Sequence, residues 1–292
     1  PPRSTLFPYT TLFRSGGNFT LTALDFFGKC SIYGYDIDPI ALELATINFA
    51  ILNKMHNSVP KGSCKYFLLD TLECQNPPQE IIPPQFDILI GNPPWGMDIT
   101  QYSHLIQNQY PFLLRANQEK SAEEKSRPYN IRDQLDSFAL FLAKNLELIK
   151  PNGIIALVIP STILFNPVYE PLRRHLLQNT KILQIDYLGE FIFSNVNLPS
   201  IVIYLKKEQP NADHLVQIRI NQKPRELAAS NDNQTNESLW DRYQLPQSNF
   251  AEHQFANFAI FTQNSSAEIL RKIDQQARSE ERRVGKECRS RW

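Results

Sequence analysis

Cysteine and long apolar runs are scarce in this sequence, and each scarcity excludes a class of protein. The four cysteines have neither C-x-x-C spacing nor the density of a disulfide framework, so we expect a reducing cytoplasm and no metal site. The apolar run from Ile154 to Ile159 is far shorter than the ~20 residues of a membrane-spanning helix. No signal-peptide pattern opens the chain, and we expect no membrane partner.

Net charge is also absent, because 30 Lys and Arg balance 30 Asp and Glu. That balance depends on the two ends of the chain, which lack core periodicity. Residues 1–15 contain two similar stretches, RSTLF and TLFRS, and residues 278–292 form an Arg- and Glu-rich run. Both resemble translated adapter sequence, although a native basic tail is the alternative for the second. Without these ends Lys and Arg number 22 and Asp and Glu 27, which predicts no general polyanion-binding surface.

A buried strand followed by a rigid loop organises the middle of the chain. Residues 86–90 are mostly apolar, which favours a strand covered on both faces, and the Gly-Asn-Pro-Pro-Trp sequence that follows cannot continue it. Pro93 and Pro94 have no N–H and a fixed φ, so the Pro93 carbonyl is left beside the Asn92 side-chain carbonyl. Two such acceptors can hold both hydrogens of an exocyclic amine and favour a pyramidal nitrogen. Trp95 offers an aromatic face to the ring that bears the amine.

Strand and helix patterns alternate along the rest of the chain. Strands are predicted at residues 31–36, 64–69, 86–90, 154–159, 182–188 and 200–205, and helices from Pro39, from Ser137 and over residues 168–178. The first helix has Asp38 as a natural N-cap, followed by apolar residues at helical spacing. Such alternation indicates an α/β fold with a largely parallel, doubly wound sheet. Only about ten residues separate the last two strands, too few for a helical crossover, so they must pair antiparallel.

The Asn-Pro-Pro-Trp sequence after a hydrophobic strand resembles the catalytic motif of amino-methyltransferases that use S-adenosylmethionine. Residues 187–190 (Tyr-Leu-Gly-Glu) and 199–203 (Pro-Ser-Ile-Val-Ile) resemble, more specifically, the class gamma N6-adenine DNA methyltransferases of restriction-modification systems, type IIG-like. This resemblance implies a Rossmann-like methyltransferase fold with a mostly parallel sheet and a terminal antiparallel hairpin. An ordinary strand and loop with two prolines is the alternative to a catalytic motif.

The resemblance assigns roles at the target base. It implies that Asn92 and Pro93 orient the amine, that Pro94 completes the loop, and that Trp95 stacks on the adenine. Phe193 matches the family's second stacking aromatic, with Phe191 as the next choice, and burial in the core is the alternative for both.

The resemblance also assigns residues to S-adenosylmethionine. Asp36 matches the acid on the cofactor ribose, where one carboxylate can accept both hydroxyl protons, and Ile37 would pack against the adenine ring. Asp70 is expected at the amine of that adenine, although a turn-forming role is the alternative. The other expected cofactor contacts are the glycine turn Gly16, Gly17, Asn18 and Phe19, together with Thr71 and Asn92.

These expectations divide the chain into four parts. Residues 1–15 are a non-native leader, and residues 16–207 are the catalytic domain with its first strand missing or replaced. Residues 208–277 begin a truncated target-recognition domain, and residues 278–292 are a non-native tail. We expect double-stranded DNA with a flipped adenine as the partner, with an attached or separate endonuclease or specificity subunit.

Two alternatives to DNA methylation stay open at this point. Similar loops serve RNA and protein-glutamine amino-methyltransferases, and a replaced first strand would lower stability and cofactor affinity. The chain as written would then be a methyltransferase fragment with little or no activity.

Overall fold

The computed structural model of the chain describes residues 3–7, 31–55, 63–73, 85–114, 135–189, 198–221 and 240–261. Contacts divide the chain into two units, Pro1–Phe258 and Ala259–Trp292, and all the elements below belong to the first. No helix among these described residues is both long and apolar enough to cross a membrane.

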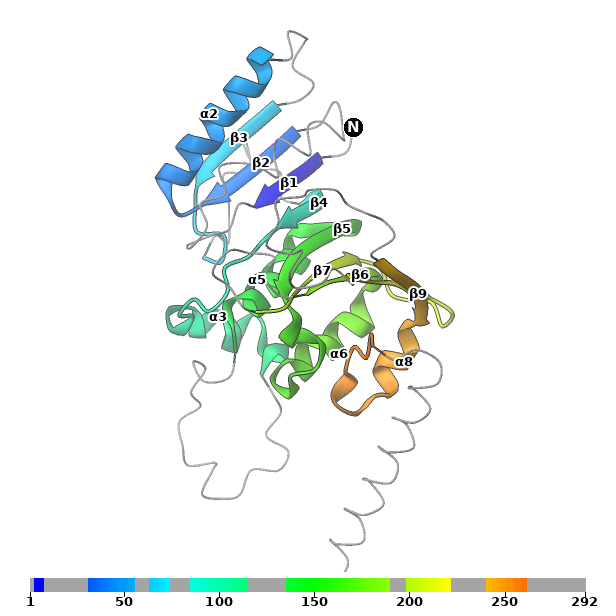
Figure 1. The fold of residues 1–292 in the computed structure, drawn as a ribbon. Coiled ribbons are helices and arrows are strands. Elements are labelled where there is room, and N and C mark those ends of the chain that lie inside the picture. Colours follow the sequence, from blue (N-terminus) through cyan, green and yellow to red (C-terminus); the bar gives the residue numbers. More distant parts are fainter. Residues whose placement is uncertain are drawn as a thin grey trace, which may run out of the picture. The chain divides into compact units, whose positions relative to one another are not determined.

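Nine strands of the described residues form one sheet, in the order β3-β2-β1-β4-β5-β7-β6-β8-β9 (Figure 1). The strands are β1 Arg3–Phe7, β2 Ser31–Asp36, β3 Ser63–Leu68, β4 Phe86–Gly91, β5 Ile149–Pro160, β6 Lys181–Gly189, β7 Ser200–Lys206, β8 Leu215–Asn221 and β9 Trp240–Pro246. The α-helices are α2 Pro39–Met55, α3 Ser103–Asn108, α5 Ser137–Leu148, α6 Glu170–Asn179 and α8 Gln247–Glu252. Short 3₁₀ helices include η1 Thr100–Tyr102, η2 Pro111–Leu113, η4 Ser161–Leu164, η5 Pro167–Tyr169 and η7 Gln254–Ala256.

The sheet is mixed, so the predicted α/β fold is confirmed and the mostly parallel arrangement only in part. Five of the eight strand pairings are parallel and three are antiparallel. The predicted antiparallel pairing of β6 with β7 is confirmed, and β7 lies between β5 and β6. This pair does not end the sheet, because β8 pairs parallel with β6 and β9 pairs antiparallel with β8. Residues 215–221 and 240–246, expected in a separate domain, therefore extend the same sheet.

The strand β1, Arg3–Phe7, occupies the position in the sheet where the sequence analysis expects the first strand of the fold to be missing or replaced. This strand pairs in parallel with β2 on one side and with β4 on the other. It comes from the segment that the sequence predicts to be a non-native leader. Whatever their origin, these residues supply the main-chain partners that the neighbouring strands need.

The strand order reverses direction between β1 and β4. The chain moves from β1 through β2 to β3 toward one edge, and from β4 to β5 toward the other. Since crossovers between parallel strands are right-handed, α2 and α5 lie on opposite faces. A reversal of this kind opens a crevice at the carboxyl ends of the strands, where ligands of open α/β sheets bind.

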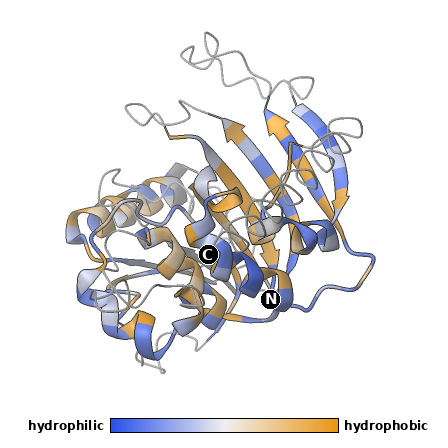
Figure 2. Ribbon diagram, turned by 90° about the horizontal axis from the view of Figure 1, so that it is seen from below, coloured by the Kyte–Doolittle hydropathy of each residue, from blue (hydrophilic) through white to orange (hydrophobic). Residues whose placement is uncertain are grey.

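Apolar side chains cover the core side of the sheet, and Figure 2 shows hydrophobic segments along the strands and on the neighbouring helices. Leu89 of β4, Ile155 and Leu157 of β5, and Phe138 and Leu142 of α5 are all fully buried. In α2 the helical spacing of the large apolar residues correctly predicts the element, but these residues do not form its buried face. The apolar stripe at that spacing is exposed to solvent, and two alanines and one leucine are buried instead. The exposed residues are Ile40, Leu44, Ile47 and Ile51, and the buried ones are Ala41, Leu42 and Ala45.

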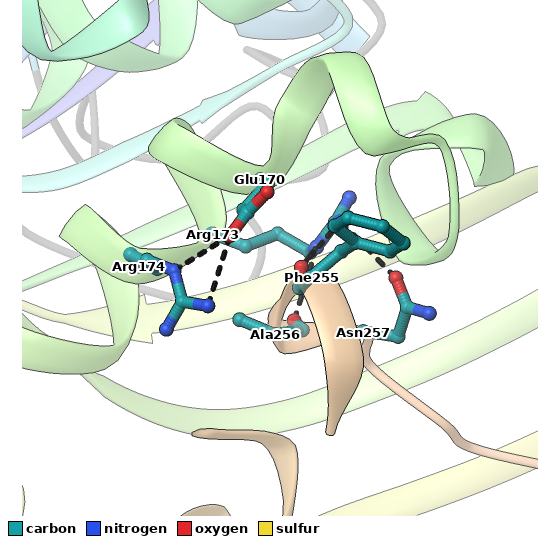
Figure 3. Close-up of polar contacts among 6 residues, drawn as sticks. All are labelled: Glu170, Arg173, Arg174, Phe255, Ala256 and Asn257. Carbon is teal, nitrogen blue, oxygen red and sulfur yellow. Dashed lines mark hydrogen bonds and ion pairs between the residues drawn. The ribbon is translucent and has the colours of Figure 1, made fainter. Parts of the chain in front are cut away.

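One buried arginine fixes the segment after β9 to α6 (Figure 3). Arg173 is 0% exposed, and its guanidinium donates to the main-chain oxygens of Phe255 and Ala256 and to the side chain of Asn257. Two further main-chain oxygens, of Ile163 and Asn166, complete its partners. Phe255 and Ala256 have φ values of 56° and 49°, in the left-handed region that is unfavourable for side-chain-bearing residues. Burial lowers the pKa of Arg173 to about 10, so the group still carries its charge at neutral pH.

Candidate active site

The predicted catalytic loop follows β4 at the crevice. Its strand is confirmed, since β4 runs from Phe86 to Gly91. Pro93 and Pro94 are buried, and Trp95 is partly exposed. The side-chain oxygen Oδ1 of Asn92 is buried and has no hydrogen-bond partner among the described residues. An unsatisfied buried acceptor costs about 1–3 kcal/mol, so this oxygen is suited to receive a hydrogen from a bound molecule.

The start of α5 holds this loop in place. Asp136 is the N-cap of the helix, and its carboxylate accepts from the main-chain N–H of Phe138 at 3.3 Å and of Gly96 at 2.9 Å. The hydroxyl of Ser137 donates to the main-chain oxygen of Pro94 at 2.6 Å. That hydroxyl also accepts from the N–H of Met97 at 3.2 Å. The loop on both sides of Trp95 is thus bonded to a rigid helix, which also leaves the Pro94 oxygen engaged.

Asp36 lies at the carboxyl end of β2, as the sequence predicts. It is 4% exposed, and its Oδ1 accepts from the N–H of Asp38 at 2.9 Å. Its Oδ2 is buried and has no hydrogen-bond partner among the described residues. Burial, with a smaller contribution from the charge of Asp38, raises the pKa of Asp36 to about 6. A buried carboxylate with one unused oxygen fits a ligand that brings hydroxyl donors.

Two further sequence-based expectations concern the residues directly after Asp36. The predicted capping role of Asp38 is confirmed, because its Oδ1 accepts from the N–H of Ile40 at 2.9 Å. Ile37 is 52% exposed, which leaves an apolar side chain beside Asp36 that a planar ring could cover.

Asp70 follows the carboxyl end of β3. Its Oδ1 accepts from the N–H of Leu72 at 3.0 Å, which is the turn-forming role named above as the alternative. Its Oδ2 accepts from the hydroxyl of Tyr102 at 2.8 Å, so the carboxylate also faces the segment that follows the loop. Thr71, beside it, is buried. The turn role and a ligand role are compatible because each carboxylate oxygen has two lone pairs.

The structure therefore brings Asp36, Asp70 and Asn92 to one edge of the sheet, since β2, β3 and β4 are parallel and each of these residues follows a strand end. Five other predicted site residues lie outside the described part of the chain, and their roles stay predictions. They are Gly16, Gly17, Asn18, Phe19 and Phe193, and the second-choice Phe191 lies outside it as well.

Sequence reasoning missed three residues that shape this edge. Asp136 and Ser137 could have been found, because an Asp directly before an apolar helical stripe is a typical N-cap. Tyr102 could not, since it lies in residues 96–136, which are rich in polar and charged residues, a composition typical of a solvent-exposed segment. Within that segment Tyr102, Leu105 and Ile106 are buried.

Comparisons with known proteins agree with this arrangement. The model of the Eco57I restriction-modification methylase family matches residues 30–193. A putative type II restriction enzyme and methyltransferase from Methanocaldococcus jannaschii is 26% identical over 133 residues, which are 46% of this chain and 10% of that protein. The type II methyltransferase M.VspI from Vibrio sp. is 22% identical over 200 residues, 68% of this chain and 41% of that protein. The chain thus spans less than half the length of either relative.

Solved structures give the same fold. The methyltransferase subunit of a type I restriction-modification system from Streptococcus thermophilus superposes with a TM-score of 0.59 at 20% identity, over 89% of this chain and 54% of that one. The type IIG restriction endonuclease BpuSI gives a TM-score of 0.63 at 17% identity, over 89% of this chain and 30% of that one. At these identities the likeness shows the fold alone, an α/β methyltransferase fold with a mixed sheet.

Proposed function

The chain belongs to the Eco57I restriction-modification methylase family, and from that premise we propose that it methylates the N6 amine of adenine in a specific DNA sequence. The proposed activity is that of a class gamma, type IIG-like, adenine-specific DNA methyltransferase with S-adenosylmethionine as cofactor. The observation that carries the proposal is the buried Oδ1 of Asn92, which has no hydrogen-bond partner in the described part of the chain and belongs to a loop that α5 holds rigid.

The residues at the crevice fit this cofactor. The Oδ2 of Asp36 is an acceptor for the ribose hydroxyls, and ribose binding would supply a donor to this oxygen, which has none among the described residues. Ile37 supplies an apolar surface for the adenine, and Asp70 an acceptor for its amine. In the proposed site Thr71 and the turn Gly16 to Phe19 complete the contacts.

Asn92 and Pro93 act on the target base. The two acceptors proposed for the target amine are Asn92 Oδ1, which is buried and has no hydrogen-bond partner among the described residues, and the Pro93 oxygen, as the resemblance to the family's motif implies. Each accepts one amine hydrogen, which favours a pyramidal nitrogen whose lone pair is localised. Trp95 stacks on the adenine, and Phe193 is proposed on its other face.

A cofactor held by Asp36, Ile37 and Asp70 would supply an electrophilic methyl group on a positively charged sulfur. Asn92 and Pro93 would hold the target amine with its lone pair free to accept that methyl group, and the proton that the amine gives up would go to water. The chain contributes positioning and electrostatics, with no covalent enzyme intermediate and no general base before the attack.

The base must leave the duplex to reach this loop, so the proposed substrate is double-stranded DNA with a flipped adenine. The names of the similar proteins include a restriction endonuclease and a methyltransferase subunit of a larger system. We infer from this that an endonuclease or a specificity subunit works with the methyltransferase, attached or separate.

Methylated nucleosides from cells test the proposal. The chain is expressed in a bacterial strain without adenine methylation, and its DNA is digested and analysed by mass spectrometry. We expect N6-methyladenine above the level of a strain that carries Asn92→Ala. Methylated cytosine alone, or methylation confined to RNA or to protein glutamine, would contradict the proposal.

A further inference from the structure

The carboxylate of Asp70 is held from two sides. The main-chain N–H of Leu72 donates to Oδ1 at 3.0 Å, and the hydroxyl of Tyr102 donates to Oδ2 at 2.8 Å. The first bond is local to the turn after β3, whereas the second spans 32 residues of sequence. Tyr102 is 3% exposed, so its ring is fixed in the core and its hydroxyl has a defined direction.

Tyr102 belongs to η1, which follows the catalytic loop in sequence. Burial and the bond to Asp70 raise the pKa of Tyr102 far above neutrality, so the hydroxyl keeps its proton and acts as a donor. A second link joins the same two segments, because His104 lies 3.5 Å from the carboxylate of Glu73. Both of those side chains are about half exposed, so this pair adds little by itself. The turn after β3 and the segment after the loop are therefore joined mainly through Tyr102.

These contacts orient the carboxylate while leaving it able to accept more. Each oxygen has two lone pairs and uses one for the bond from Leu72 or from Tyr102. Without the hydroxyl, Oδ2 would lose its fixed partner, and the carboxylate could turn about its side-chain bond while Leu72 still held Oδ1.

We propose that Tyr102 is a positioning residue that aims Asp70 at the exocyclic amine of the cofactor's adenine, and so sets the preference for a 6-amino purine over a 6-oxo purine. The inference rests on the cofactor site proposed above and adds to it the residue that gives the site its selectivity.

The chemistry of the two rings explains the preference. An adenine amine donates a hydrogen to the carboxylate. A hypoxanthine ring carries an oxygen at the same position, and two acceptors that face one another in a desolvated site repel. A site that is fixed to receive a donor discriminates strongly, whereas a carboxylate that can turn away discriminates less.

Calorimetric titration of two ligands into the full 292-residue chain tests the inference. The ligands are S-adenosylhomocysteine, the demethylated cofactor, and S-inosylhomocysteine, which has hypoxanthine in place of adenine. We expect the unchanged chain to prefer the adenine ligand, and Tyr102→Phe to reduce that preference by about fivefold, as one lost hydrogen bond implies. Most of the change should be weaker binding of the adenine ligand.

Tyr110→Phe is the matched control. Tyr110 is also buried, and its hydroxyl also donates to a carboxylate, that of Glu147 near the far end of α5. This variant should keep the preference of the unchanged chain, which separates positioning from a general loss of stability.

Two results would overturn the inference, and they differ from one another. If the unchanged chain prefers the adenine ligand and Tyr102→Phe retains the full preference, Tyr102 does not position Asp70 and the cofactor site stands. If the unchanged chain binds neither ligand, the proposed cofactor site fails and the inference fails with it.

Discussion

The hydroxyl of Ser137 donates to the main-chain oxygen of Pro94 over 2.6 Å, and this bond fixes the loop after β4 to the first turn of α5. The same hydroxyl accepts from the N–H of Met97, and Asp136 accepts from the N–H of Gly96. The three bonds hold the residues on both sides of Trp95, Pro94 before it and Gly96 and Met97 after it. They make the position of Asn92 a consequence of tertiary structure rather than of the prolines alone.

Ser137→Ala should therefore slow methyl transfer by about tenfold, because a loop displaced by a fraction of an ångström no longer places both acceptors on the amine. The lost bonds should also lower the free energy of unfolding by about 1–3 kcal/mol. Single-turnover rates below the unfolding transition measure the first effect. Ser63→Ala is the control, since Ser63 is exposed on the edge strand β3 and its hydroxyl donates to that of Ser31 at 3.3 Å. Equal single-turnover rates in the two variants would show that Ser137 serves stability alone.

The affinity for S-adenosylhomocysteine should depend on pH through Asp36. Burial raises the pKa of this carboxyl to about 6 in the chain without ligand. Ribose hydroxyls donate to the ionised form, so binding favours that form and lowers the pKa. The affinity is then full above about pH 6 and falls as the pH drops through this value, by up to about tenfold for each pH unit.

Titrations between pH 5 and pH 8 measure this dependence. Asp36→Asn should bind weakly throughout that range and lose the decline at low pH, because its side chain does not titrate. An affinity for the unchanged chain that is the same at both ends of the range would exclude Asp36 from the cofactor site.

Arg173→Met should destabilise the fold by more than about 3 kcal/mol, because it leaves several buried main-chain oxygens without donors. Urea unfolding measures the change. Arg174→Met is the control, since Arg174 is half exposed and pairs with Glu170 at 2.9 Å on the helix surface, where an ion pair contributes less than about 1 kcal/mol (Figure 3). Similar midpoints for the two variants would contradict the role assigned to Arg173.

Local sequence patterns were sufficient for several elements of this fold. The strand at Ser31–Asp36, the N-cap at Asp38 and the strand from Phe86 follow from apolar runs and turn residues that act within a few positions. The antiparallel pairing of β6 and β7 follows from the short connection between them. Each of these features is decided by residues that are close in the sequence.

Features that depend on distant partners were not predictable in this way. The pairing of β8 with β6 joins two segments whose local sequence patterns do not indicate that they pair. The sequence therefore predicted a sheet that ends with the hairpin of β6 and β7. The Ser137 to Pro94 bond spans 43 residues, and the Tyr102 to Asp70 bond spans 32. The exposed stripe on α2 shows the same limit, because helical spacing identifies a face without deciding which side the sheet covers.

The most direct test of the account is the transfer of a labelled methyl group from S-adenosylmethionine to duplex DNA by the full chain and by Asn92→Ala. The reaction is run with protein in excess over DNA, so that weak DNA binding does not hide the chemical step, and the label is located by nucleoside analysis. Calorimetric titration of S-adenosylhomocysteine into both proteins is measured in parallel. The account predicts label on adenine N6 with the unchanged chain and a loss of at least about a hundredfold in Asn92→Ala. The ligand affinity should change far less than the transfer rate, because Asn92 is one of several expected cofactor contacts whereas its Oδ1 acts directly on the target amine. Comparable transfer by the two proteins would contradict the account.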